Sequence, residues 1–288
     1  MNRPRLAFWC ATTLALSACL GLISGCGSDS GTGPVGTVAL KLNVQNDAPG
    51  LASLVETVTL TVSYGSASLA PDTLGFDNGI LHDTLSVVPG DSLTFILRAY
   101  DATGRQLFEG RQGPVDVGPG ATLTLNILLR PSVPMLRAAP FVQSVQLGSD
   151  ALVDVDVDVY NVDSLFGAAF RVQYDTTVLD FSGAVEGDFL KGIGTPAPTL
   201  AIVLKDSAGF VAYAVTRQNA PDVHLPGSSV GQDPGRLATF QFAKKHAGTT
   251  AITFNPATVR LDRPNGEQVL NRSGLVLESA TVHVLAGP

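Results

Sequence analysis

Cysteine is scarce in this sequence and absent beyond residue 26. The three cysteines are Cys10, Cys19 and Cys26, so the long remainder of the 288-residue chain can form no disulfide. Stability in that remainder must come from buried apolar side chains, and its length is ample for two hydrophobic cores. The 30 glycines and 18 prolines, with 45% hydrophobic residues, are typical of an ordered, turn-rich protein.

Basic and aromatic side chains are also few. Lys and Arg number 18 against 25 Asp and Glu, a formal net charge of −7, and without Arg3 and Arg5 the rest of the chain carries −9. A chain this acidic has no basic stripe to neutralise phosphates, which argues against a nucleic-acid partner. Anionic lipid would repel it, so any membrane association should run through an anchor.

No residue pattern typical of an enzyme stands out. The four histidines, His82, His224, His246 and His283, show no zinc spacing. Residues 227–231 match G-x-S-x-G, but that motif needs a sharp strand-to-helix turn, and no helix follows here. We interpret it as a loop, and we expect no catalytic residue, no metal ligand and no cofactor.

Three aspartates, Asp154, Asp156 and Asp158, alternate with valines in the manner in which a calcium loop begins. An EF-hand loop also needs glycine at its sixth position, which here is Val159. Carboxylates on one face of a strand are about 7 Å apart, too far to share an ion without other ligands. The row is therefore interpreted as a solvated strand face that discourages edge pairing.

The first residues are typical of an export signal. A short basic segment precedes residues 6–23, which carry no charge. Ile23-Ser24-Gly25-Cys26 resembles a bacterial lipoprotein processing site, and so does the segment that ends at Cys19. A Gly/Ser-rich run follows Cys26 but not Cys19, and a lipid-anchored protein needs such a tether. We predict a signal peptide over 1–25, lipidation at Cys26, a tether over 26–36 and an outer-membrane or cell-surface location; a plain signal peptide or an uncleaved anchor stays open.

Short alternating strands fill residues 37–130. Apolar residues alternate over 38–44, 58–64, 93–99 and 123–129, and Gly, Pro, Asn and Asp cluster between them. This pattern indicates a β-sandwich, and the region resembles an immunoglobulin-like or transthyretin-like module. Two prolines in residues 131–134 predict a linker over 131–137, which leaves 138–288 as a second β-sandwich.

Residues 151–190 carry the most specific pattern. Residues 152–160 alternate apolar and charged side chains without a break, as a strand with one buried and one wet face does. A turn follows, and the next strand, over 168–174, should bury Phe170, Val172 and Tyr174 together.

This order of strand, turn and strand resembles a cohesin domain. The matching residues are Asn161, Val162, Leu165, Gly167, Phe170, Val172, Tyr174, Asp175, Val178, Leu179, Glu186, Gly187, Phe189 and Leu190. Residues 235–242 resemble the "G.LA...F" strand of the family, and 248–254 resemble its "G…ITF" strand. The resemblance covers about residues 138–285.

The resemblance implies a jelly-roll sandwich that binds a calcium-loaded dockerin on one flat sheet face. It places the strands 169–174, 210–216 and 237–243 in that sheet. Calcium would then enter only through the dockerin-like partner. The outward residues expected to contact the partner are Arg171, Gln173, Ala212, Ala214, Thr216, Thr239 and Gln241.

Other functions stay open beside this one. Gly167-Ala168-Ala169 stands where cohesins often have polar dockerin contacts, which weakens a cellulosome-type partner. A carbohydrate-binding lipoprotein is one alternative, although the only tryptophan is Trp9 and little remains for a sugar-stacking platform. A structural envelope protein is another. The leading prediction is an all-β, non-catalytic envelope protein that captures a dockerin-like or other protein, with a possible link to polysaccharide breakdown.

Overall fold

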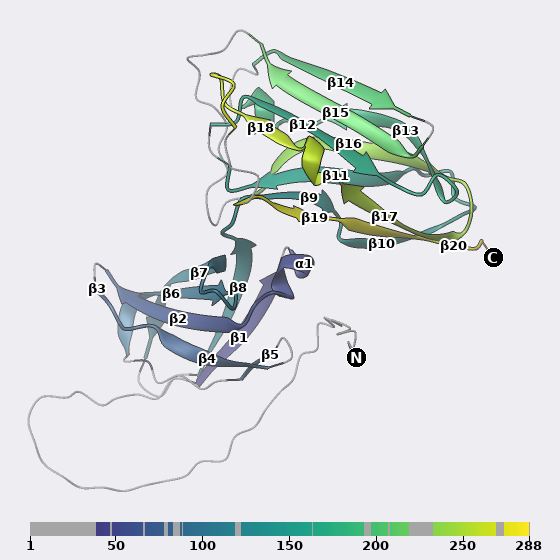
Figure 1. The fold of residues 1–288 in the computed structure, drawn as a ribbon. Coiled ribbons are helices and arrows are strands. Elements are labelled where there is room, and N and C mark those ends of the chain that lie inside the picture. Colours follow the sequence, from purple (N-terminus) through teal and green to yellow (C-terminus); the bar gives the residue numbers. More distant parts are fainter. Residues whose placement is uncertain are drawn as a thin grey trace, which may run out of the picture.

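The structure is a computed structural model that describes residues 39–287, except 47, 66, 78–79, 83–86, 88, 119–121, 163, 193–196, 207, 219–232 and 269–273. It is almost entirely β, which confirms the predicted fold class. Two units follow one another along the chain, and Figure 1 shows the first below the second.

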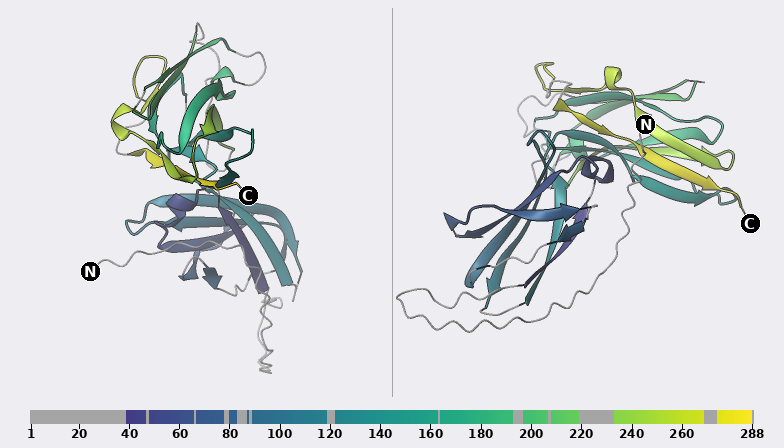
Figure 2. Two further views of the ribbon diagram at one scale, coloured as in Figure 1. Left: turned by 90° about the vertical axis from the view of Figure 1, so that its right-hand side faces the viewer. Right: turned by 60° about the horizontal axis from the view of Figure 1, so that its bottom comes forward.

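The first unit is built on one hydrogen-bonded sheet. Its elements are β1 (Ala39–Asn46), α1 (Pro49–Ala52), β2 (Thr57–Tyr64), β3 (Ala67–Ser68), β4 (Asp72–Asp77), β5 (Ile80–His82), β6 (Gly90–Tyr100), β7 (Gln106–Val117) and β8 (Thr122–Pro131). The strand order is β1-β8-β7-β6-β2-β4-β5, with β3 paired to β2, and β1 runs parallel to β8. The sheet curls around its core (Figure 2), where Phe95, Leu97 and Phe108 are fully buried.

The second unit begins directly after β8. Its elements are β9 (Met135–Ala139), β10 (Val142–Gln146), β11 (Val153–Tyr160), β12 (Gly167–Gln173), β13 (Leu179–Glu186), η1 (Phe189–Lys191), β14 (Thr199–Lys205), β15 (Phe210–Arg217), β16 (Gly235–Lys244), β17 (Gly248–Phe254), η2 (Pro256–Thr258), β18 (Arg260–Asp262), β19 (Val276–Glu278) and β20 (Ala280–Leu285).

These strands form two sheets with a core between them. One sheet has the order β10-β20-β17-β12-β15-β14, with β18 on β12, and the other has the order β13-β16-β11-β9-β19. Aromatic rings from both sheets meet in the core. The Phe170 ring lies 5.4 Å from Tyr213 of its own sheet and 6.1 Å from Phe240 of the other sheet, centroid to centroid. Phe170, Val172 and Tyr174 are all buried, as the alternation predicted.

The two units share buried surface at their junction. Met135 of β9 and Tyr160 of β11 are buried in the core cluster of the first unit, although both belong to strands of the second. Residues 131–137, expected as a linker, contain the last residue of β8 and the first residues of β9. The chain therefore passes from one sheet to the next within three residues, Ser132 to Pro134.

Candidate partner-binding face

The outward sides of three neighbouring strands form one surface in the second unit. β15 pairs with β12 on one side and with β14 on the other, both antiparallel. Directly opposed residues share a face of a sheet. We call this surface the alanine face, and its residues are Ala169, Arg171 and Gln173 of β12, Ala212, Ala214 and Thr216 of β15, and Leu200, Ile202 and Leu204 of β14.

The face exists because the inward residues of the same strands are large and buried. Val211, Tyr213 and Val215 of β15 are at most 3% exposed and point into the core. Their alternation with Ala212, Ala214 and Thr216 leaves small side chains over most of the outer side of β15, and Phe210 stands at its start. The Tyr213 hydroxyl donates to the Leu237 carbonyl, 3.2 Å away, and burial raises the pKa of that phenol well above its ordinary value. Tyr213 is therefore part of the core and unavailable for sugar stacking.

A shallow hollow of about 160 Å³ lies over the alanines. Ala212 and Ala214 of the central strand line its middle, which we call the floor. Ile202 and Leu204 of β14 line one side, and Arg171 of β12 lines the other together with Thr258. On β14, Leu200, Ile202 and Leu204 are 47%, 49% and 65% exposed. The face thus combines a small-residue floor with an aliphatic wall, a surface that suits an apolar protein segment.

One end of the face carries a fixed charge. The Arg171 guanidinium lies 3.5 Å from a carboxylate oxygen of Asp206 and 5.1 Å from the centroid of the Phe210 ring. Asp206 accepts from the backbone amides of Ala208 and Phe210, which holds the turn between β14 and β15. Arg171 is therefore held in place over Phe210, and it covers the one aromatic ring near this end of the face.

The structure brings together only part of the predicted site. Arg171, Gln173 and Thr216 lie on the alanine face as expected. Thr239 and Gln241 do not, because β16 belongs to the opposite sheet. The expectation that residues 210–216 and 237–243 share a sheet is wrong. Alternation shows which residues of a strand share a side, but it cannot show which sheet the strand joins.

Thr239 and Gln241 belong to a polar row on the outer side of the other sheet. Thr239 donates to Asp156, and Gln241 donates to Asp154 over 3.2 Å. Asp156 and Asp158 both form ion pairs with Arg236, at 2.6 and 3.2 Å. The aspartates of β11 are thus paired across the strands.

The aliphatic wall of the face was not among the residues predicted from the sequence. Leu200, Ile202 and Leu204 fall in the segment Leu200-Ala201-Ile202-Val203-Leu204, which is apolar at every position. A continuous apolar run gives no alternation from which an outer side could be read. The one available signal was its length, which suits a strand.

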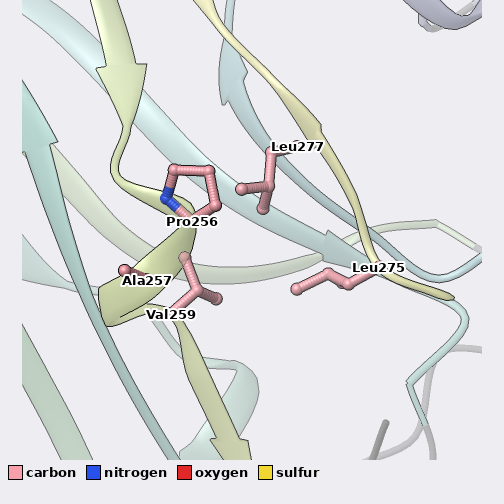
Figure 3. A pocket seen from close by; sticks show the side chains of 5 residues that line it. All are labelled: Pro256, Ala257, Val259, Leu275 and Leu277. Carbon is pink, nitrogen blue, oxygen red and sulfur yellow. The ribbon is translucent and has the colours of Figure 1, made fainter. Parts of the chain in front are cut away.

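A second hollow, of about 470 Å³, lies beside η2 and the start of β19. It is lined by Pro256, Ala257, Val259, Leu275 and Leu277, whose side chains converge from the two segments in Figure 3. All five are apolar, so the described residues offer this hollow no charged or hydrogen-bonding side chain to orient a ligand.

Other predicted features fall outside the described residues or find no support among them. Cys26, with its signal and tether, and the G-x-S-x-G segment with His224 lie outside the described residues. Within the part of the chain that the structure describes, no three His, Cys, Asp or Glu side chains gather as a metal site. No helix within that same part is long and apolar enough to cross a membrane.

Comparisons with known proteins give distant likenesses in fold. No family model matches the chain, and no curated protein matches it. Among solved structures, a type II cohesin domain from the cellulosome of Acetivibrio cellulolyticus is 16% identical, with a TM-score of 0.43 over 52% of this chain and 95% of its own. A non-cellulosomal cohesin from Archaeoglobus fulgidus is 14% identical, with a TM-score of 0.39 over 53% and 91%. A cohesin from Acetivibrio cellulolyticus in complex with a dockerin is 15% identical, with a TM-score of 0.40 over 53% and 99%.

Proposed function

We propose that the protein is a non-catalytic binding protein of the cell envelope whose alanine face captures a dockerin-like protein. The observation that carries this proposal is the exposed apolar wall of Leu200, Ile202 and Leu204 beside the alanine floor. Soluble proteins seldom leave such a contiguous apolar patch uncovered unless it binds something.

The shape of the face favours a protein partner over a sugar. A stable protein interface needs roughly 800 Å² from each side, which one face of a sandwich can supply. Sugar recognition uses exposed aromatic rings. Here Tyr213 is buried and the Arg171 guanidinium lies over Phe210, so the face lacks a stacking platform.

The kind of partner is inferred from the sequence. The motif residues from Asn161 to Leu190 resemble those of cohesins, whose partners are calcium-loaded dockerins. An apolar helix face with a carboxylate near one end would fit the alanine floor and could reach Arg171.

The test uses the chain from Gly27 to Pro288, which contains every described residue. It serves as bait in a pull-down from the secreted and envelope proteins of the organism that produces it. The pull-down is done once with calcium and once with a chelator. We expect calcium-dependent capture of a protein that bears duplicated D-x-N-x-D-G loops. Ala214→Arg fills the centre of the face and should reduce the measured affinity for that protein at least tenfold.

The matched control is Ala102→Arg, which makes the same change at an exposed turn of the first unit. It should leave the affinity unchanged. Capture that survives Ala214→Arg would remove the alanine face as the binding site. No capture of any protein with such loops, in either condition, would overturn the dockerin-like partner.

We also propose that Cys26 carries a lipid that anchors the protein. Its support is the aliphatic-small-small-Cys pattern followed by a Gly/Ser-rich run. Labelled palmitate should be incorporated by the native chain and by Cys19→Ser, but not by Cys26→Ser. If Cys19→Ser loses the incorporation and Cys26→Ser keeps it, the lipidated residue is Cys19 and not Cys26.

A further inference from the structure

The strand β14 is an apolar strand at the edge of its sheet. In the described part of the chain it pairs only with β15, and Figure 1 shows it at the outer margin of the second unit. Both of its sides are exposed, since Val203, which faces the inner side, is 37% exposed. Lys205 is the only charged residue in the seven.

Such an edge is unusual in a soluble protein. Natural sheets protect their edges with charges, prolines or bulges, because unpaired backbone N–H and C=O groups can pair with another chain. The opposite edge of the same sheet, β10, carries Gln143, Ser144 and Gln146. Over its first six residues β14 carries no charge and no proline, and its one polar side chain is Thr199.

The sequence of β14 is complementary to itself in the antiparallel direction. If two copies pair about Ile202, then Leu200 lies opposite Leu204, Ala201 opposite Val203 and Ile202 opposite Ile202. All five positions then have apolar partners. Shifting the centre by one residue to Val203 would place Ala201 opposite Lys205 and Leu200 opposite Asp206.

The ends of the strand add charge complementarity. In the same register Lys205 lies opposite Thr199 of the second copy. The Thr199 hydroxyl donates to Glu186 of β13 in its own copy. Within its own copy the Lys205 ammonium group lies 2.7 Å from Asp180. In the dimer it would also come close to the Glu186 carboxylate of the other copy. The pairing places opposite charges at both ends.

We propose that β14 is a self-association edge, which pairs antiparallel with β14 of a second copy to form one continuous sheet. Antiparallel neighbours related by a two-fold axis keep the same side of the sheet outward. The two alanine faces would then lie side by side and point in the same direction, so one dimer could hold two partners. This inference does not depend on the proposed function, because edge pairing uses backbone groups and can be measured without any partner.

The test measures mass against concentration for the chain from Gly27 to Pro288. Sedimentation equilibrium from about 1 µM to about 500 µM covers the dissociation constants expected for an interface that buries less than the ~800 Å² per partner of a standard complex. We expect a concentration-dependent dimer. Ile202→Lys and Ile202→Glu each place like charges at the centre of the pairing and should each give a monomer, while an equimolar mixture of the two should form dimers again.

The matched control is Val142→Lys on the opposite edge strand of the same sheet, where the native side chain is 50% exposed against 49% for Ile202. It should dimerise as the native chain does. A native chain that stays monomeric throughout the range would overturn the proposal. So would a dimer that Ile202→Lys leaves intact, or a dimer that Val142→Lys disrupts instead.

Discussion

Arg137 and Glu278 lie opposite each other on the parallel strands β9 and β19, with Nε 3.9 Å from Oε2. Glu278 also accepts from the backbone amides of Gly50 and Leu51 in the first unit, at 2.7 and 3.2 Å. A carboxylate of the second unit thus accepts hydrogen bonds from the first backbone amides of α1 in the first unit. The register extends the pair into a row of alternating charge, Arg236, Asp158, Arg137 and Glu278, across four strands.

Glu278→Ala should destabilise the chain strongly. The glutamate is 4% exposed, so its removal takes away one of the two carboxylates beside the Arg137 guanidinium and leaves two amides without an acceptor. Breaking a buried ion pair on one side costs about 3–5 kcal/mol. Urea unfolding should show this loss in the free energy of unfolding. The control is Glu267→Ala at an exposed turn, which should change it by less than about 0.5 kcal/mol; equal effects of the two substitutions would count against the junction as a source of stability.

The same carboxylate should make stability depend on pH. Burial raises the pKa of Glu278 above its ordinary 4.5, and Arg137 with the two amides only partly offsets this. Because the folded pKa is the higher one, the contribution of Glu278 is full below pH 4.5 and is lost as pH rises through the raised value. Burial likewise raises the pKa of Asp158, and that effect cancels when native chain and Glu278→Gln are compared.

The measurement is urea unfolding of both proteins between pH 7 and pH 4.5. The free energy of unfolding of the native chain, relative to Glu278→Gln, should rise as the pH falls, by at most about 1.4 kcal/mol per pH unit. Parallel curves for the two proteins would show that Glu278 does not titrate differently in the folded state.

Asn161 should be more sensitive to alanine than to glycine. Its φ is 49°, in the left-handed region, and its side-chain amide donates to the carbonyls of Pro131 and Val133. Asn161→Gly loses the hydrogen bonds, about 1 kcal/mol each, but tolerates the backbone. Asn161→Ala loses the same bonds and adds about 1–2 kcal/mol for the left-handed conformation. Equal free energies of unfolding for the two variants would show that the left-handed backbone conformation at position 161 adds no cost for alanine.

Burial along a strand was predictable from the sequence where only the strand's own unit covers it. Val153, Val155, Val157 and Val159 alternate in the sequence and are all at most 1% exposed. Asp158 and Tyr160 belong to the side of β11 expected to be wet, yet they are 4% and 2% exposed. Tyr160 is buried in the core of the first unit, and a strand pattern carries no information about a neighbouring unit that covers its end.

The candidate face was predictable in part for a similar reason. Arg171, Gln173 and Thr216 were found because their strands alternate clearly. The β14 wall was not predicted because that strand is apolar at nearly every position. Thr239 was assigned to the wrong sheet because the residues of a strand do not show which sheet the strand joins. Side-chain periodicity is local, whereas sheet membership depends on pairing between distant segments.

Two glycines near the end of β13 should respond oppositely to alanine. A Cβ on Gly187 would lie 2.1 Å from the Arg236 carbonyl oxygen, and backbone cannot give way cheaply, whereas a Cβ on Gly183 would meet nothing within 4 Å. We expect Gly187→Ala to lower the free energy of unfolding by about 1–3 kcal/mol through overpacking. Gly183→Ala should leave it unchanged or raise it by up to about 1 kcal/mol, because alanine restricts the unfolded chain. Thermal and urea unfolding of both variants measure this; if they lose equal stability, close backbone approach is not what keeps Gly187 in the Glu186-Gly187 pair of the cohesin-like segment.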